Sequence, residues 1–280
     1  GSGVLIEAGD TAHGTELWYG ARTENSAHLL KDFVPGQGSG LSSPQFAAFK
    51  GRVLFAAKTP EQGCEPWITD GTVEGTQSLG DLNSGVADSR PLRFTACGDR
   101  AFFVAETADD GNELWITDGT LSGTHLVKDI NPDTASSTPY AFCPFKGGLL
   151  FSALDADHGE ELWFSDGTRE GTRLVSDISP GPANSDMGTP IVRGERAYFT
   201  ATGPDGRHGI WSTDGTAAGT TEEKIGLAAT DTKLTERNVE WLSALGKLFF
   251  TRTTAVEGEE LWVSETDGSN AHIVRDIHIG

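Results

Sequence analysis

Tryptophan recurs along this chain at nearly constant spacing within copies of one motif. Six of the seven tryptophans belong to this series and stand at positions 18, 67, 115, 163, 211 and 262, so the intervals are 49, 48, 48, 48 and 51 residues. Two close copies, ELWITDGTLSGTHLVKD and ELWFSDGTREGTRLVSD, begin at Glu113 and Glu161. A repeat of this length is typical of propeller blades rather than of helical solenoids. The sequence therefore predicts six similar structural units.

Each repeat divides into four short strands, A to D, seen most clearly over residues 44–81. Strand A is expected at Gln45–Phe49, strand B at Arg52–Ala57 and strand D at Thr76–Leu82, with Trp67 on strand C between them. The apolar density of A and B marks them as interior strands. We predict an all-β fold, a six-bladed β-propeller of four-stranded antiparallel blades. No stretch of useful length has a helical period.

The two ends of the chain bear on how such a ring would close. The first repeat opens on strand B at Val4, so five A strands are expected beside six of each other strand, and one blade is expected to be three-stranded. We expect residues 4–280 to form a single propeller domain of six repeats and Gly1–Gly3 to be a cloning remnant. A slice of a larger ring is the alternative.

The charge balance excludes some partners. With 41 acidic and 21 basic residues, the formal net charge is −20, which repels phosphate backbones and anionic membrane surfaces. We therefore expect no nucleic-acid partner. No run of 18 apolar residues is present, so no membrane insertion is expected either. The three cysteines cannot pair fully and lack metal-ligand spacing, and a monomer is expected.

The DGT segment between strands C and D has a local structural explanation. An aspartate accepts backbone N–H bonds within a tight turn, and the glycine after it tolerates positive φ. We predict structural turn roles for these residues, with a repeated calcium site as the alternative; no other cofactor is expected. The turn aspartates are Asp70, Asp118, Asp166, Asp214 and Asp267.

Candidate binding residues lie where the repeats differ from one another. In a propeller whose strands run outward from A to D, the B–C and D–A loops share one face, called here the loop-rich face. The B–C loops of this chain are rich in acids and histidines, which suits a ligand site but also suits solvent exposure. Trp241 falls in strand A of the last repeat, next to the expected central channel. The candidates are Asp110, Asp155, Asp157, His158, His208 and Trp241.

Two acidic positions vary together between repeats. A glutamate precedes the motif's LW or PW dipeptide and an aspartate ends strand D in five repeats, whereas Gly209 and Ile225 replace them in the fifth. We predict that each pair meets a common cationic or N–H donor, with Arg52, Arg100 or Arg196 as the basic candidates. Simple degeneration of the fifth repeat is the alternative.

The segment ELWITDGTLSGTHLVKDINP resembles the bacterial ELWxxDGT repeat family over essentially the whole chain. The last repeat, ELWVSETDGSNAHIVRDI, is also similar to the blade pattern of the TolB propeller domain. The resemblance implies a β-propeller of an exported or surface-associated bacterial protein. It transfers no catalytic residue.

Two function classes remain after these observations. The first is a noncatalytic propeller, secreted or at a bacterial surface, that binds a protein, glycan or small molecule on the loop-rich face. The second is a metal-dependent hydrolase or lyase with its site at the channel mouth. The chain contains no HExxH, GxSxG, Walker or EF-hand motif, so an enzyme is the less favoured expectation. The metal, the ligand and the native number of blades are left open.

Overall fold

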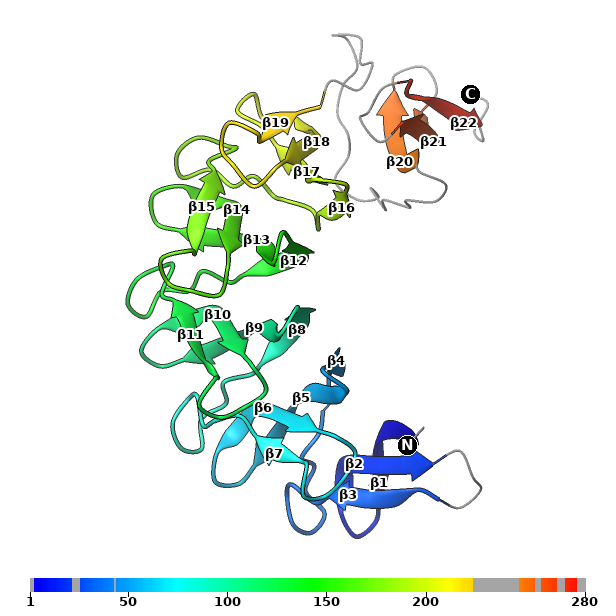
Figure 1. Ribbon diagram of the computed structural model, residues 1–280, viewed down its shortest axis with the longest axis vertical. Helices are drawn as coiled ribbons and strands as arrows, with labels where there is room; N and C mark the ends of the chain where they lie inside the picture. Colours follow the sequence, from blue (N-terminus) through cyan, green and yellow to red (C-terminus); the bar gives the residue numbers. More distant parts are fainter. Residues whose placement is uncertain are drawn as a thin grey trace. The chain divides into compact units, whose positions relative to one another are not determined.

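The computed structural model describes residues 3–21, 26–42, 44–223, 247–254, 258–265 and 270–275. Every helix-or-strand element in these ranges is a β-strand (Figure 1), which confirms the all-β prediction. The chain divides into two compact parts. One comprises Gly1–Pro139 with Asp166–Glu170, and the other comprises Tyr140–Ser165 with Gly171–Gly280. Trp241 and Asp267 lie outside the described residues.

Each part contains three antiparallel sheets whose strands follow one another along the chain. The sheets of the first part are β1 (Gly3–Asp10), β2 (Gly14–Ala21) and β3 (His28–Lys31); β4 (Ala47–Phe49), β5 (Arg52–Thr59), β6 (Gly63–Thr69) and β7 (Gln77–Ser78); and β8 (Leu92–Cys97), β9 (Arg100–Thr107), β10 (Gly111–Thr117) and β11 (His125–Lys128). Two of these three sheets are four-stranded blades of the predicted kind.

The second part repeats this arrangement. Its sheets are β12 (Tyr140–Phe145), β13 (Gly148–Asp155), β14 (Gly159–Ser165) and β15 (Arg173–Ser176); β16 (Ile191–Arg193), β17 (Arg196–Thr202), β18 (His208–Thr213) and β19 (Thr221–Glu222); and β20 (Lys247–Thr254), β21 (Gly258–Glu265) and β22 (His272–Arg275). The predicted strand A of the last repeat would fall in residues 224–246, which lie outside the described ranges. The closed ring of six blades stays a prediction.

The strand register explains why the tryptophans recur. Each tryptophan of the four-stranded sheets lies directly opposite a phenylalanine of strand B; the pairs are Phe55–Trp67, Phe103–Trp115, Phe151–Trp163 and Phe199–Trp211. Ile6 lies opposite Trp18 in the same way, so β1 is a strand B, as predicted. Cross-strand aromatic pairs of this kind stabilise antiparallel sheets.

Strand D is shorter than predicted. Residues 76–82 were expected to be extended, but β7 contains only Gln77 and Ser78. Leu79 still bonds to the neighbouring strand, since its N–H donates to Pro66 O of β6 at 2.9 Å, but Leu82 N donates to a side-chain carboxylate oxygen of Glu65 at 2.9 Å. The chain therefore leaves the sheet early and enters the D–A loop.

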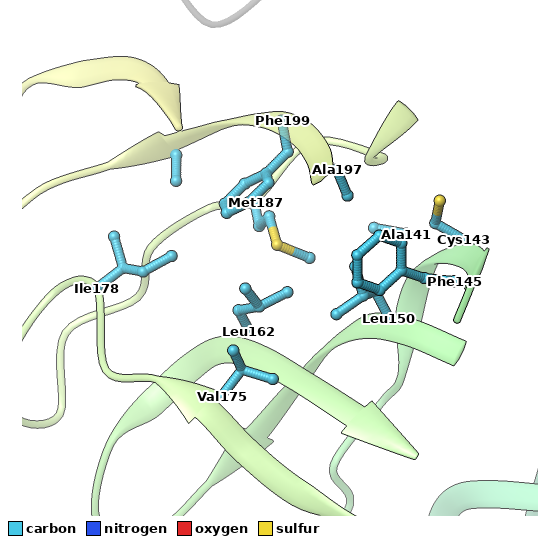
Figure 2. Packing of buried hydrophobic residues seen from close by; sticks show 11 residues of the cluster. Ala141, Cys143, Phe145, Leu150, Leu162, Val175, Ile178, Met187, Ala197 and Phe199 are labelled. Carbon is cyan, nitrogen blue, oxygen red and sulfur yellow. The ribbon is translucent and has the colours of Figure 1, made fainter. Parts of the chain in front are cut away.

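The core consists of apolar side chains held between successive sheets. In the second part, Leu150 and Leu162 of one sheet pack in the same buried cluster as Ala197 and Phe199 of the next. Figure 2 shows Met187, from the D–A loop, lying between these two groups. Met187 is 2% exposed, and its unbranched side chain suits an irregular gap of this kind.

The DGT turns make the local bonds of a tight turn. Asp118 Oδ1 accepts Thr120 N at 2.9 Å and Thr120 Oγ1 at 2.6 Å, and the latter bond is the largest cause of the lowered pKa of Asp118. Gly119 has φ 90°. The turns containing Asp70, Asp166 and Asp214 repeat both bonds.

The same turns also contact the preceding blade. Lys50 Nζ donates to Asp118 O at 3.3 Å, and Arg100 donates to Asp166 O at 3.2 Å. A Cβ on Gly119 would lie 2.4 Å from a guanidinium nitrogen of Arg52. The positive φ favours glycine here, and any larger residue would also displace the end of the Arg52 side chain.

We expect Asp118→Ala to lower the free energy of unfolding by about 1 kcal/mol, because two hydrogen bonds within an exposed turn are lost. Chemical denaturation measures the change. Asp109→Ala, which removes an equal charge from an exposed loop, is the control and should have a smaller effect. If calcium raised the melting temperature of the wild type but not of Asp118→Ala, the turn would be a metal site instead.

Candidate functional site

The repeated glutamate of strand C is buried and bonds to the D–A loop of its own repeat. Glu113 is 0% exposed. Its carboxylate accepts Ile130 N at 3.1 Å, Ser137 N at 2.8 Å and Ser137 Oγ at 2.5 Å. The equivalent bonds of the other repeats join Glu16 to Phe33 and Gly40, Glu65 to Leu82 and Ser89, and Glu161 to Ile178 and Ser179.

These glutamates therefore hold a loop in place. The aspartate that ends strand D bonds within the same loop, since Asp129 Oδ2 accepts Asp133 N at 3.2 Å. Glu113 and Asp129 thus bond to N–H groups of one loop, but their donors are different residues, so the predicted common donor is wrong. The arginine part is wrong: Arg100 donates to Asp166 O, and Arg196 donates to Ser212 Oγ and to Gly219 O. These arginines bind the DGT turns because they open strand B, beside those turns.

Burial leaves these carboxyl groups with an unusual titration. It raises the pKa of Glu113 to about 7 and outweighs the hydrogen bonds from Ser137, Ile130 and Asn131, which lower it. It also raises the pKa of Glu161 to about 7. A buried carboxylate is disfavoured relative to its protonated form until enough donors compensate it.

We expect the free energy of unfolding to fall as the pH rises from about 5 to 8. Both folded-state pKa values, about 7, exceed the ordinary value of 4.5. The stabilisation linked to them is therefore fully present below about pH 4.5 and is lost as the pH passes through 7. Urea denaturation at several pH values measures the slope. The net charge of −20 acts in the same direction, so the test is whether Glu113→Gln flattens the slope; an unchanged slope would contradict the assignment.

The loop candidates predicted from the sequence do not form one cluster. His158 Nδ1 lies 2.9 Å from Asp155 Oδ2, and this hydrogen bond is the main cause of the raised pKa of His158. Asp157 is exposed at the same loop tip. Asp110 bonds to Thr107 within another hairpin. These residues therefore make turns of their own hairpins, whereas His208 lines a cavity.

That cavity lies between two neighbouring sheets of the second part, beside the first residues of β12 and β18 and the end of β17. Its volume is about 380 Å³. The lining residues are Tyr140, Asp186, Met187, Gly188, Thr200 and His208. They come from β12, from the loop that follows β15, and from β17 and β18.

Comparison of the repeats shows that one position of the cavity lining differs between them. Leu92 pairs with Val104 in one sheet, and Tyr140 pairs with Ser152 at the same place in the next. Gly188, another 48 residues along, takes this place in the third. Gly188 N donates to Thr200 O at 2.9 Å, and a Cβ on Gly188 would lie 2.5 Å from Thr200 Oγ1, so a side chain here would require Thr200 to shift; Gly188 contributes only backbone to the lining of the cavity.

A second position changes its chemistry at the same point of the fold. The residue immediately before the repeated glutamate position is Thr15, Cys64, Asn112, Glu160 and His208 in the first five repeats. Glu160 accepts a hydrogen bond from the Tyr140 hydroxyl and another from Ser152 Oγ at 3.1 Å. His208 Nδ1 lies 3.1 Å from Thr202 Oγ1. Two adjacent repeats thus place ionisable side chains beside one cavity.

The electrostatics of the cavity are dominated by carboxyl groups. Burial is the largest cause of the raised pKa of Tyr140, followed by its hydrogen bond to Glu160; the charges of Glu160 and Asp186 act in the same direction. Both acids therefore act on the Tyr140 hydroxyl. In the described ranges, no three His, Cys, Asp or Glu side chains are grouped so as to hold a metal ion.

Sequence reasoning missed Tyr140, Glu160, Asp186 and Gly188. The polar composition of the B–C loops favoured residues at hairpin tips, whereas the cavity is lined by residues near strand ends and in one D–A loop. A usable signal was present in the sequence: comparing equivalent positions shows abrupt changes from Leu92 to Tyr140 to Gly188 and from Asn112 to Glu160 to His208.

No family model matches this chain, and no curated protein matches it. Solved structures do. They include a puromycin hydrolase, with 13% identity and a TM-score of 0.47 over 96% of this chain and 42% of that one. A structure from a study of two prolyl endopeptidases shows 11% identity and 0.48 over 90% and 38%. Pyrococcus horikoshii acylaminoacyl peptidase shows 12% and 0.44 over 93% and 41%.

Identities this low concern the fold only, and this chain spans less than half the length of each of these proteins. All three are named as hydrolases or peptidases. The prediction of a noncatalytic binding propeller is contradicted by these names and is withdrawn, together with its metal-dependent hydrolase or lyase alternative. In the part of the chain that the structure describes, no helix is long and apolar enough to cross a bilayer.

Proposed function

We propose that this chain is the substrate-binding β-propeller part of a hydrolase and that the cavity at Tyr140 and His208 holds part of the substrate. The hydrolase class is proposed because the similar structures are named as hydrolases or peptidases. The observation that supports a binding role is the cavity itself, where two adjacent repeats replace ordinary blade residues by polar and ionisable ones. Binding sites are typically concave and carry a few convergent polar groups.

The groups around the cavity are held in position before any ligand arrives. Glu160 is fixed by Tyr140 and Ser152. Its backbone also bonds to the D–A loop, because Ser185 N donates to Glu160 O at 2.9 Å. Asp186 follows Ser185 directly. Preorganisation of this kind lowers the entropic cost of ordering a site on binding.

The nucleophile of the reaction lies, in this proposal, outside the described residues. A serine nucleophile needs an adjacent base, usually histidine, that is itself oriented by a third group. Ser152 is 0% exposed and donates to a carboxylate, Glu160. This arrangement serves to hold Glu160 rather than to attack an acyl group.

The repeat motif extends the proposal to origin and location. On its ELWxxDGT pattern the chain would belong to a bacterial protein that is exported or surface-associated. Acting on peptides outside the cell would be consistent with such a location.

Titration calorimetry with short peptide amides tests the proposed function. We expect the wild-type chain to bind them without turnover and His208→Gln to weaken binding by about tenfold, equivalent to about 1.4 kcal/mol. His158→Gln is the matched control, because that histidine lies on a loop tip and does not line the cavity; it should change affinity less than about twofold.

Two results would overturn the proposal. One is the absence of binding to any peptide amide, or binding that His208→Gln leaves unchanged. The other is hydrolysis by this chain that is lost in Ser152→Ala, which would place the chemistry within the blades.

A further inference from the structure

We infer that the cavity at Tyr140 and His208 selects a positively charged amino group, with Asp186 in contact with it and Glu160 adding its charge from behind the Tyr140 hydroxyl. This inference rests on the proposed function and specifies which end of the substrate the cavity takes. A protonated amine is the ligand class in question, whether it is the free amino end of a peptide or another alkylammonium.

The charge around the cavity is negative and unbalanced. Its lining contains one acid, Asp186, and no lysine or arginine, and a second acid, Glu160, bonds to the lining residue Tyr140. Among the residues that the structure describes, neither acid forms an ion pair with Lys or Arg. The partners of the Glu160 carboxylate are neutral hydroxyl groups, so its charge is not cancelled locally.

The equivalent place in the first part of the chain has a different distribution of charge. A cavity of about 450 Å³ there includes Cys64, at the position of Glu160, and Arg90, at the position of Asp186. Lys58 in this cavity pairs with Asp88 at 3.1 Å, and Arg90 pairs with Glu106 at 3.2 Å. Here each acid has a cationic partner. The unbalanced negative charge at Tyr140 is therefore a departure from the repeat rather than a property of it.

Asp186 lies at the cavity because it belongs to a turn that recurs in three repeats. Arg90, Thr138 and Asp186 follow one another at 48-residue intervals and share a positive φ of 48°, 44° and 47°. The backbone of this turn is thus the same in three repeats, and only the side chain changes. Asp186 therefore places a carboxylate on a turn whose backbone conformation is shared by the other two repeats.

An ammonium group placed in the cavity would be stabilised by the charges of two nearby carboxylates. It could also donate hydrogen bonds to the Thr200 hydroxyl and the His208 imidazole. Charge-assisted hydrogen bonds are about twice as strong as neutral ones. A carboxylate ligand would be repelled by the same groups.

The test compares two ligands that differ at the amino group, phenylalaninamide and N-acetylphenylalaninamide, by calorimetry at pH 6.5, where a free α-amino group is protonated. We expect the free amine to bind about tenfold more tightly than the acetylated compound at low salt. This ratio should fall in 0.5 M NaCl, because salt screens exposed charges.

Variants locate the effect. Glu160→Gln keeps an acceptor for Tyr140 and Ser152, and Asp186→Asn keeps the size of an exposed side chain; each should reduce the ratio several-fold, and the double variant should bring it to within about twofold of unity. Glu170→Gln removes the same charge from an exposed turn and should leave the ratio unchanged. Tyr140→Phe should retain the preference, since the charges remain. Melting temperatures confirm that each variant is folded.

The outcomes separate this inference from the proposed function. Equal binding of both ligands, or tighter binding of the acetylated one, would overturn charge selection and leave a substrate-binding cavity in place. The same holds if Tyr140→Phe loses as much affinity as Glu160→Gln, which would indicate recognition of neutral hydroxyl groups. Failure of both ligands to bind would overturn the proposed function as well.

Discussion

Replacing Glu113 by alanine is expected to lower the free energy of unfolding by about 3–5 kcal/mol. The loss of this side chain leaves four backbone or hydroxyl donors of the D–A loop, on Ile130, Asn131 and Ser137, without their acceptor. A buried donor without a partner costs about 1–3 kcal/mol. Urea denaturation measures the total, and amide hydrogen exchange over residues 130–137 should show the loop opening first.

Two further variants make this result specific. Glu106→Ala removes an acid from the neighbouring strand β9, where Glu106 pairs with Arg90 at the surface, and should cost less than about 1 kcal/mol. Glu113→Gln keeps one acceptor oxygen and should fall between the two, which guards against a variant that does not fold. Faster exchange throughout the sheet with no preference for the loop would contradict the assigned role.

Replacing Trp115 by alanine is expected to cost about 3–5 kcal/mol through the cavity left behind. Trp115 is 8% exposed and packs with Phe103 and Phe94 between two sheets of the first part. Its ring centroid lies 6.4 Å from that of Phe103. The indole nitrogen is buried without a hydrogen-bond acceptor among the described residues, so the contribution of this side chain is packing.

Trp115→Phe is the matched control, because it keeps an aromatic ring while giving up an N–H that has no acceptor and part of the indole volume. It should cost less than Trp115→Ala, since the cost of a large-to-small replacement rises with the volume of the cavity left. A loss of ligand binding in Trp115→Ala at unchanged stability would instead indicate that the repeated tryptophans face a ligand.

The blade could be predicted from the sequence because its causes are local. The spacing of the tryptophans, the apolar run of strand B and the DGT turn all act within one repeat, and six copies made the pattern plain. Strand D was predicted too long: Leu79 N still bonds to Pro66 O of β6, but Leu82 N bonds to the side chain of Glu65 and not to a backbone carbonyl of that strand. That competition between sheet and loop depends on a carboxylate 17 residues away from Leu82.

The site was harder to predict because it depends on which face of a strand a residue occupies. Glu160 and Glu161 are adjacent in the chain, yet Glu161 is buried against the D–A loop and Glu160 bonds to Tyr140 beside the cavity. Successive side chains of a strand point to opposite faces, so a shift of one residue in register exchanges the two roles.

By itself, the sequence determined the all-β class, the repeated blade and the turns, since each of these follows from the φ preferences and apolar pattern of neighbouring residues. Only the tertiary structure decided that the repeated glutamate binds a loop, that Arg100 contacts a DGT turn, and that Gly188 and Tyr140 line one cavity. Those outcomes require residues from different strands or different repeats to share one space. Which side chains meet there is set by register and by packing between sheets, and neither is local to the motif.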